Sequence, residues 1–481
     1  MKNYFLTICF LFASLTIFAQ SGHIMQGVGA VNMSMGGAAT AQPLDINGAM
    51  QWNPATLSEF DGKIVSFNIG AFFSSPELRS SLPEGAMGPG SPSVSGVTED
   101  DRGTSPMPSL AFLWGKEDSK HTFGVSAFGI SGFGVTFNEE TNLPFDGEGN
   151  PNPNWDPNNS NPINYPQAFG GFGHIESDYM LLQIGLSYAF EISDQLSIGI
   201  QPNFNYASLE LAPNPLATPS QTLGYPAADK ASAIGYGGQV GIFYNSGEVL
   251  KLGASYKSKQ YFGDFDFDQK YLDGSEAPNV TFNMNYPAIY SVGLGLSGGK
   301  FDFALDYRYV DYENTEGFEE SGWQIADSGP MEGFPTGAVN GFGWKNMSIL
   351  SVGLQYQATE KLPIRIGYTY SSNPIDDELA FYSIPATAVI ENAAQIGFSY
   401  VINNKIDLSA VYHYGFRGDG ASGELLNPTP EAFGGPWNAD TNPLGAVPGS
   451  SVSYDMTTSM IQVGINYSFG NNNDETPEPI E

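Results

Sequence analysis

Histidine is the side chain best suited to acid–base chemistry near neutral pH, and the chain has four: His23, His121, His174 and His413. His413 lies on the polar face of an alternating segment, where it is best interpreted as a lining residue. The only cysteine, Cys9, lies in a segment that we expect to be removed, so the mature chain has no thiol nucleophile. The sequence also contains no glycine-rich phosphate loop and no metal-ligand spacing. It therefore predicts a protein that is not an enzyme and that has no cofactor or metal.

Charged residues recur on the polar faces of the alternating segments. They include Lys251, Asp306, Arg308, Arg365 and Asp407. We interpret them as a polar network that faces the interior and holds an N-terminal segment through Asp45, Glu59 or Asp61. A head-group site for a ligand is the alternative interpretation.

The elements that carry these residues are strands. Residues 301–309, 362–370 and 461–469 alternate apolar with small or polar side chains, which is the pattern of a strand with one face in an apolar medium. We count fourteen such segments. They are 63–75, 107–116, 120–137, 177–191, 195–211, 233–245, 249–268, 279–297, 300–313, 346–358, 362–373, 389–402, 405–416 and 456–469.

The connections between these segments differ in length in a regular way. Every second one is tight, as at 192–194 and 403–404, whereas most of the others are long, as at 138–176, 314–345 and 417–455. Short turns on one rim and long loops on the other are typical of outer-membrane barrels. The sequence therefore predicts an all-β protein: a fourteen-stranded antiparallel transmembrane barrel in the outer membrane of a Gram-negative bacterium, with both termini in the periplasm.

Composition agrees with a barrel and limits the partners. Charged residues make up 14% of the chain and aromatic residues 13%, and no apolar run of about 20 residues could span a bilayer as a helix. The formal net charge of −33 would repel phosphates, which excludes nucleic acid. Trp114, Tyr188, Tyr309 and Tyr400 are expected at the membrane interfaces. The expected partners are outer-membrane lipid and lipopolysaccharide, and we expect a monomer.

The two ends of the chain differ from the barrel region. Residues 1–19 have the charge and the short apolar run of a signal peptide. Residues 20–61 show no alternation and little charge, so we expect a compact plug, or hatch, inside the barrel of residues 62–469. Residues 470–481 form an acidic tail that we expect in the periplasm.

Several short motifs resemble the long-chain fatty acid and hydrophobic-compound transporter family (FadL/TodX type). The most specific is Asn53-Pro54-Ala55 after Trp52, which resembles the hatch motif of that family. Residues 123–137, 252–258 and 365–368 resemble its strands. The resemblance implies fourteen strands, an N-terminal hatch and passive uptake of long-chain fatty acids or aromatic hydrocarbons. The basic residue that would bind a carboxylate after the fifth strand is missing, since no Lys or Arg lies between Tyr206 and Asp229.

The third predicted strand is rich in glycine and suggests an exit route. Gly129, Gly132 and Gly134 flank Ile130 and Ser131, and glycine inside a strand often marks a bulge or bend. The resemblance implies an inward kink here, which would open the wall sideways to lipid. Aromatic loop residues are expected to capture the hydrophobic ligand first: Phe169, Phe172, Phe318, Trp323, Phe334 and Trp437. Two alternatives remain open, a protein-binding barrel of the type IX secretion shuttle kind and a general porin.

Overall fold

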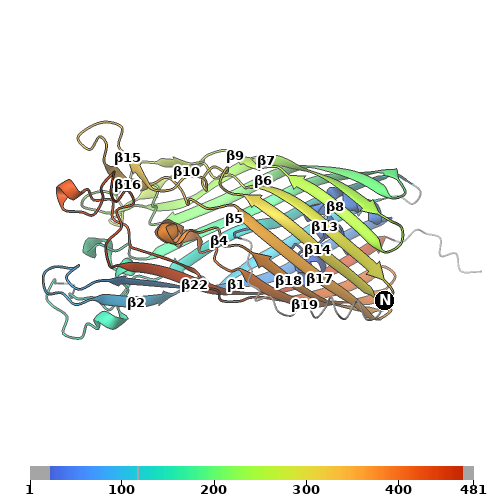
Figure 1. Cartoon of the computed structure of the whole chain (residues 1–481), viewed down its shortest axis with the longest axis horizontal. Coiled ribbons are helices and arrows are strands. Elements are labelled where there is room, and N and C mark those ends of the chain that lie inside the picture. The colour runs from blue at the N-terminus through green and yellow to red at the C-terminus, as the bar shows by residue number, and fades with distance from the viewer. Residues whose placement is uncertain (1–21, 116–118, 147, 470–481) are drawn as a thin grey trace, which may run out of the picture.

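The structure is a computed structural model, and it describes residues 22–469 apart from 116–118 and 147. The predicted signal peptide (1–19) and the acidic tail (470–481) lie outside the described residues. Within them, the chain forms a long closed barrel from which several strands extend at one end (Figure 1).

Fourteen antiparallel strands make up the barrel in the described part of the chain, and each pairs with the next. The last strand, β22, pairs with β1 from Lys63↔Phe469 to Ser81↔Ser451, which closes the sheet. The strands are β1 (Lys63–Leu82), β3 (Thr104–Trp114), β4 (His121–Phe137), β5 (Ile175–Ser193), β6 (Leu196–Ala212), β7 (Ala227–Asn245), β8 (Leu250–Lys257), β13 (Ala288–Gly298), β14 (Phe301–Asp311), β17 (Met347–Thr359), β18 (Leu362–Ser371), β19 (Asn392–Asn403), β20 (Ile406–Gly415) and β22 (Ser451–Phe469).

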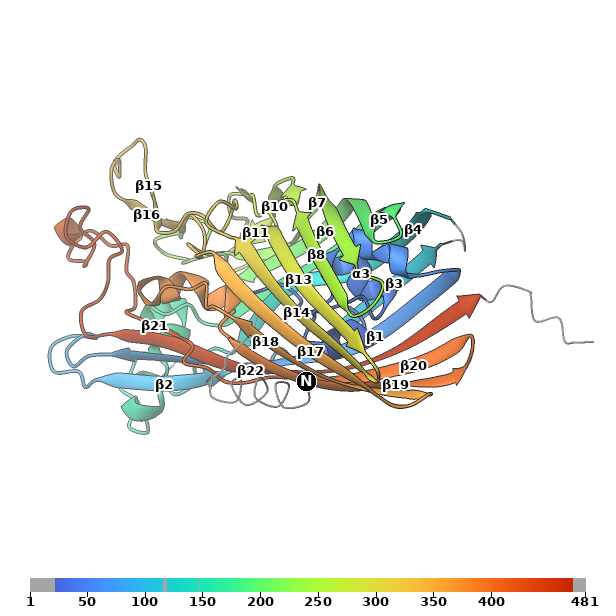
Figure 2. The same ribbon diagram turned by 45° about the vertical axis from the view of Figure 1, so that its right-hand side comes forward.

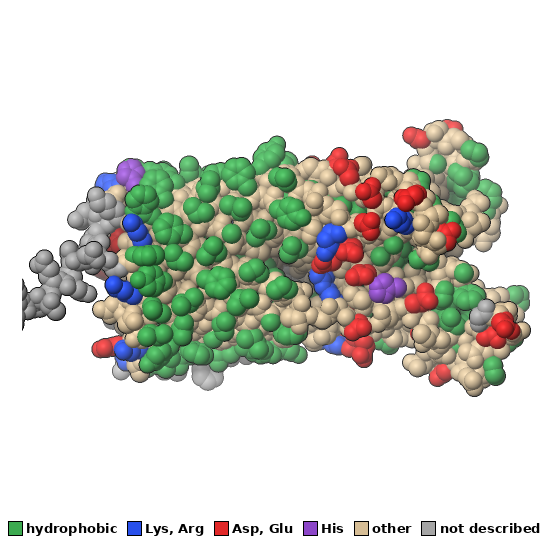
Figure 3. Space-filling model, turned by 180° about the vertical axis from the view of Figure 1, so that it is seen from behind, with side chains coloured by type: hydrophobic (Ala, Val, Ile, Leu, Met, Phe, Trp, Pro, Cys, Tyr) green, Lys and Arg blue, Asp and Glu red, His purple; other side chains and the backbone are tan. Residues whose placement is uncertain are grey.

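The alternation in the sequence follows the two faces of the wall. In β1, Phe67 and Ile69 are 46% and 49% exposed, whereas Ser66 and Asn68, which alternate with them, are 0% and 3% exposed. Among the described residues, neighbouring strands pair all the way round the periplasmic end of the barrel, as a barrel in a bilayer requires. On the face shown in Figure 3, hydrophobic side chains cover the barrel wall, and acidic and basic side chains gather where that belt ends.

The long loops contain their own short elements. They are β2 (Val94–Glu99), β9 (Tyr261–Phe262), β10 (Phe265–Phe267), β11 (Gln269–Lys270), β12 (Val280–Phe282), β15 (Trp323–Ile325), β16 (Pro335–Val339) and β21 (Ala421–Gly423), with the 3-10 turns η3 (Pro157–Asn159), η4 (Pro162–Asn164), η5 (Gln167–Phe169), η6 (Asp377–Ala386) and η7 (Glu431–Phe433). Several predicted strand boundaries are wrong. β1 continues to Leu82 where an end at 75 was predicted, β7 begins at Ala227 and not at 233, and β22 begins at Ser451 and not at 456. The largest errors concern two consecutive strands. The strand predicted at 249–268 ends at Lys257 and the one predicted at 279–297 begins at Ala288. The residues between them form short separate pairings, β10 with β12 and both β9 and β11 with β7.

Residues 22–61, which we call the lumen segment, lie inside the barrel (Figure 2). The segment contains α2 (Ala30–Ser34), α3 (Ile46–Trp52) and η2 (Pro54–Glu59), and almost all of its residues are buried. Asp45 caps α3 by accepting a hydrogen bond from Gly48 N at 3.0 Å. None of the helices in the described ranges has the length and apolar character needed to cross a membrane.

Candidate functional site

The pairing between strands β3 and β4 ends part of the way up the barrel wall. They pair from Trp114↔Phe123 to Ser109↔Phe128 and no further. Beyond that point β3 follows β1 as far as Thr104, and β4 follows β5 as far as Phe137. The wall therefore has a gap between the upper part of β3 and residues 129–137 of β4.

A β-bulge at Ile130 marks the start of the gap. The register between β4 and β5 shifts between Gly129↔Leu182 and Ser131↔Leu181, so Ile130 is the extra residue. This bulge lies within the segment that the sequence predicts to be kinked.

The lumen segment takes the place of the missing strand at the edge of β4. Met25 N donates to Ile130 O at 3.0 Å, and Gly132 N donates to His23 O at 3.2 Å. The hydroxyl of Ser131 also donates to His23 O, at 3.0 Å. These bonds satisfy backbone groups of a strand edge that would otherwise face the gap without partners, which is costly away from water.

The extracellular end of the gap is closed by the residues that precede β3. Asp101 N donates to Thr136 O at 2.9 Å, and Asp100 accepts a hydrogen bond from Thr136 N at 2.6 Å. Arg102 then reaches across β4, where it donates to Ser177 O at 3.2 Å and forms an ion pair with Asp178. The gap is thus a bounded window, with paired strands below it and a polar strap above it.

Three of the four glycines of β4, at positions 129, 132 and 134, lie on the outer face of the window, and the Arg102 side chain covers the last of them. Gly132 is paired with Met180, whose side chain is 50% exposed on the outer wall, and Gly134 is paired with Asp178 on the same face. A Cβ atom at Gly129 would meet nothing within 4 Å, whereas one at Gly134 would overlap the Arg102 guanidinium. None of the three has a positive φ. These glycines therefore provide space, and the bulge does not depend on their conformational freedom.

A cavity of about 470 Å³ extends from the window into the lumen. Its apolar lining comes mostly from methionine and phenylalanine: Met25, Met33, Phe72, Met107, Phe133, Met456 and Met460. His23, Tyr179 and His413 also line it. This volume lies within the range of small-molecule sites, about 300–1,000 Å³. The cavity is large enough for a small hydrophobic molecule, and it lies beside the gap in the wall.

An aromatic cluster fixes the start of the lumen segment at this cavity. The His23 ring stacks on Phe318, with centroids 5.0 Å apart and planes 8° apart. The Tyr312 hydroxyl lies 2.9 Å from His23 Nδ1, and Trp344 packs against both rings. Phe318, which the sequence suggested as a capture residue, is fully buried in this cluster.

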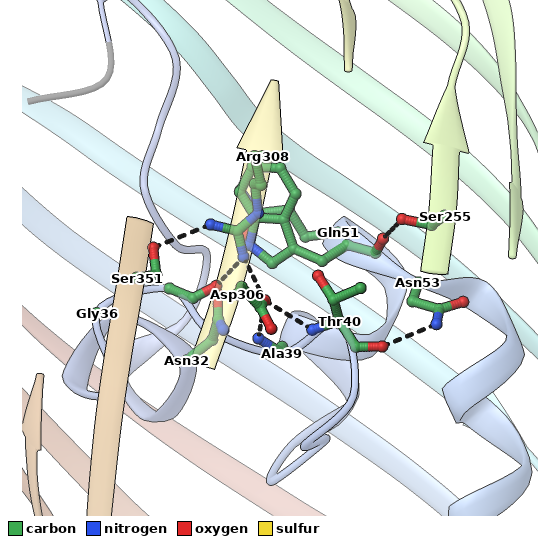
Figure 4. A network of polar contacts seen from close by, with 12 residues as sticks. Asn32, Gly36, Ala39, Thr40, Gln51, Asn53, Ser255, Asp306, Arg308 and Ser351 are labelled. Carbon is green, nitrogen blue, oxygen red and sulfur yellow. Dashed lines mark hydrogen bonds and ion pairs between the residues drawn. The ribbon is translucent and has the colours of Figure 1, made fainter. Parts of the chain in front are cut away.

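A buried ion pair holds the middle of the lumen segment (Figure 4). Asp306 accepts hydrogen bonds from Ala39 N and Thr40 N, both at 2.8 Å, and from Arg308 Nη2 at 2.7 Å. Arg308 donates to Gly37 O at 2.6 Å and lies 3.7 Å from the centre of the Trp52 ring. Asp306 and Arg308 are 0% and 1% exposed, so each charge depends on the other for compensation.

The other members of the predicted polar network do not join this pair. Lys251 forms an ion pair with Glu59 at 2.7 Å, near the periplasmic rim. Arg365 donates to Gln355 and Ser399 on neighbouring strands, and Asp407 accepts from Asn466 at 2.8 Å. Two of the five predicted residues therefore contact each other, and three form separate contacts.

The Asn53-Pro54-Ala55 motif is packed directly against the wall. Asn53 Nδ2 donates to Thr40 O at 2.8 Å and to Ile242 O at 3.1 Å, and its Oδ1 accepts from Ala55 N at 3.1 Å. A Cβ atom at Gly241 would overlap Asn53, and one at Gly199 would overlap the backbone of Ala55. Glycine is therefore required in the wall where this motif approaches it.

The sequence matches a known family of outer-membrane proteins. The family model described as outer membrane protein transport protein (OMPP1/FadL/TodX) matches residues 166–455, which is more than half of the chain. The chain belongs to this family. Its members are transport channels of the outer membrane, so the expected family and location are confirmed.

Solved structures of similar fold cover almost the whole chain. The toluene transporter TodX of P. putida has a TM-score of 0.61 at 16% identity, covering 93% of this chain and 99% of that one. A Pseudomonas aeruginosa FadL homologue has a TM-score of 0.63 at 13% identity, covering 94% and 100%. The Ralstonia pickettii toluene transporter TbuX has a TM-score of 0.57 at 17% identity, covering 92% and 99%. At these identities the likeness establishes the fold, and it confirms the fourteen-stranded barrel. No curated protein matches the sequence.

The aromatic residues predicted to capture ligands in this family member fall into two groups. Phe169 is 42% exposed and stacks on Phe145, so it is open to solvent. Trp323 and Trp437 are 5% and 6% exposed, and their indole N–H groups donate to Leu444 O and Pro443 O. Both tryptophans are therefore structural in this state.

Phe172 and Phe334 are partly buried and pack against other aromatic residues of the loops. Phe172 contacts Tyr225 and Phe381, and Phe334 contacts Trp437. Burial raises the pKa of the Tyr225 hydroxyl in the same loop layer, so it stays neutral at any ordinary pH. These aromatic side chains thus form uncharged contacts within the extracellular loops.

Two residues near the site were missed by reasoning from the sequence. Arg102 spans the window, and the acidic pair Asp100-Asp101 before it was the one available signal. Lys257 is 3% exposed, lies 5.8 Å from the centre of the Trp52 ring and contacts Gln183 at 3.4 Å. Its position on the inward face of β8, two residues after Ser255, could have revealed it.

Proposed function

We propose that the protein takes up small hydrophobic molecules through the outer membrane and releases them sideways, between β3 and β4. The observation that carries this proposal is the cavity of about 470 Å³ that opens at a gap in the barrel wall. An apolar molecule leaving by this route passes from an apolar cavity to lipid, and it avoids the unfavourable transfer into water.

In this proposal the extracellular loops, the cavity and the window act one after another. Exposed loop aromatics such as Phe169 collect the molecule outside the lipopolysaccharide, which blocks direct diffusion. The methionine-rich cavity binds it, because flexible thioether side chains adapt to ligands of different shape. The part of the window at Gly129 and Gly132, which have no side chains, then lets it pass.

We also propose that the lumen segment acts as the hatch of this transporter. It is held by the buried Asp306–Arg308 pair and by Asn53, which supports a plug that stays in place during passage. Its packing against the wall argues against a general water-filled porin. Each barrel encloses its own cavity, which supports a monomer as the working unit.

The test adds side chains to the window. Gly129→Val and Gly132→Val place branched side chains on its outer face, and we expect uptake of radiolabelled toluene or palmitate by intact cells to fall at least about tenfold. The matched control is Gly298→Val at the periplasmic end of β13, where, as at Gly129, a Cβ atom meets nothing within 4 Å. Heat-modifiable migration on gels and surface labelling check that each barrel is folded and inserted.

Unchanged uptake by the two window variants would contradict lateral release, and the ligand would then have to leave past the lumen segment. If deletion of the protein left uptake of every hydrophobic probe unchanged, the transport proposal would fail. Stable co-purification with secreted proteins would then favour the protein-binding barrel.

A further inference from the structure

The outer mouth of the cavity carries more acid than base. Among its lining residues, three carboxylates, Glu176, Asp178 and Glu210, surround two cations, Arg102 and Lys230. Lys230 Nζ lies 2.6 Å from Asp178 and 3.4 Å from Glu210, and Arg102 pairs with Asp178. Both cations are therefore already compensated, and the mouth has one excess negative charge.

A carboxylate that reached this mouth on its way to lipid would meet that excess charge and no free cation among the lining residues. Like charges at such distances in a partly desolvated site disfavour binding. Asp100 and Asp101, which precede Arg102 at the upper edge of the window, add to the negative field. The buried Lys257 does not line this cavity.

The wall of the cavity offers hydrogen bonding without charge. His23 and Tyr179 are 4% and 1% exposed and both line the cavity. In the described part of the chain, His23 Nε2 and the Tyr179 hydroxyl have no hydrogen-bond partner. A buried polar atom without a partner is unfavourable, so a ligand that supplies one gains affinity.

We propose that the cavity selects neutral hydrophobic molecules that carry one hydroxyl group, such as alkyl alcohols or phenols, and that the acidic mouth rejects carboxylates. A hydroxyl group both donates and accepts, so it can pair with His23 Nε2 in either tautomer and with the Tyr179 hydroxyl. This inference rests on the proposed transport function and narrows its substrate class.

The test compares three photoreactive probes in outer-membrane vesicles that contain the full protein. The probes are an eight-carbon alcohol, carboxylate and alkane bearing the same diazirine, used at pH 8, where the carboxylate is ionised. Mass spectrometry quantifies labelled peptides from residues 22–26 and 176–180, normalised to labelling of the lipid-facing side of β13 and β14. We expect the alcohol to label the cavity peptides at least about tenfold more than the carboxylate does.

Two sets of variants test charge selection and hydroxyl recognition separately. Glu176→Gln with Glu210→Gln gives the mouth an excess positive charge, and carboxylate labelling should rise about tenfold while alcohol labelling stays constant. The matched control is Asp194→Asn with Glu248→Gln at exposed periplasmic turns, which should change neither. Tyr179→Phe removes only a hydroxyl without a partner, and it should reduce the preference for alcohol over alkane by about two- to tenfold.

Failure of this inference and failure of the transport proposal give different outcomes. Equal labelling by alcohol and carboxylate in the native protein, or no response to the glutamine pair, would overturn the charge selection. An unchanged preference in Tyr179→Phe and in a His23→Gln variant would overturn the hydroxyl recognition. If no probe labelled the cavity peptides, the transport proposal itself would be contradicted.

Discussion

Removing the carboxylate of Asp306 should loosen the lumen segment without unfolding the barrel. Asp306→Ala removes the acceptor for Ala39 N and Thr40 N, and it leaves Arg308 as a buried cation that has lost its carboxylate partner. Breaking a buried ion pair by removing one partner costs about 3–5 kcal/mol. The barrel strands keep their own hydrogen bonds, so this cost falls on the segment that the pair anchors.

Hydrogen–deuterium exchange measures this cost directly at the affected amides. Since about 1.4 kcal/mol corresponds to a factor of ten, exchange in the peptide covering residues 37–41 should accelerate by about 100- to 4,000-fold. Asp407→Asn is the matched control, because Asp407 is only partly buried and its partner Asn466 is neutral. We expect this control to change exchange by less than tenfold.

A second substitution, at Arg308, separates the effect of the buried charge from that of the lost hydrogen bonds. Arg308→Met in the Asp306→Ala background removes the uncompensated charge, so exchange should return at least tenfold toward the native rate. Exchange within tenfold of native in Asp306→Ala alone would show that the ion pair does not hold the segment. No recovery in the double variant would show that the lost hydrogen bonds, and not the buried charge, account for the effect.

Other predictions concern the loops and the motif. Trp323→Ala should destabilise the extracellular loops by about 3–5 kcal/mol and make them sensitive to limited proteolysis, because Trp323 is 5% exposed. Phe169→Ala should leave proteolysis unchanged and slow the uptake of toluene, because Phe169 is exposed; faster proteolysis of this variant would contradict that assignment. Asn53→Ala should destabilise the lumen segment by about 1–3 kcal/mol, measured by exchange at residues 40–56, because it leaves buried backbone groups without partners. Lys251→Ala should cost at most about 1 kcal/mol, since its ion pair with Glu59 is partly open to water at the rim.

The barrel could be predicted from sequence because its signal is local. Alternation within each strand and the lengths of turns and loops are visible within a few residues, and they give the correct strand number. The same reasoning failed at 249–268, where an alternating run continues past Lys257 into a separate hairpin. Periodicity indicates that a segment is extended, but it does not indicate which segment is the partner.

The window could be predicted only in part. The glycines of β4 indicated an irregular strand, whereas the pairing of residues 23–25 with residues 130–132 joins segments more than 100 residues apart and leaves no local pattern. Trp323 and Trp437 illustrate the opposite difficulty. An aromatic residue in a polar loop suggests an exposed contact, but these loops are long enough to bury their own tryptophans.

The pairing of Ile24 with Ser131 has a consequence for how the protein is assembled. The N-terminal residues act as a fifteenth, very short strand that caps an open sheet edge, so the barrel is finished only when they have docked. A truncated chain without them would present this edge during insertion, and unpaired edges recruit one another. Such a truncated protein would be prone to edge-to-edge dimerisation and domain swapping. Its measured conductance would therefore include misassembled dimers as well as barrels that have only lost the plug.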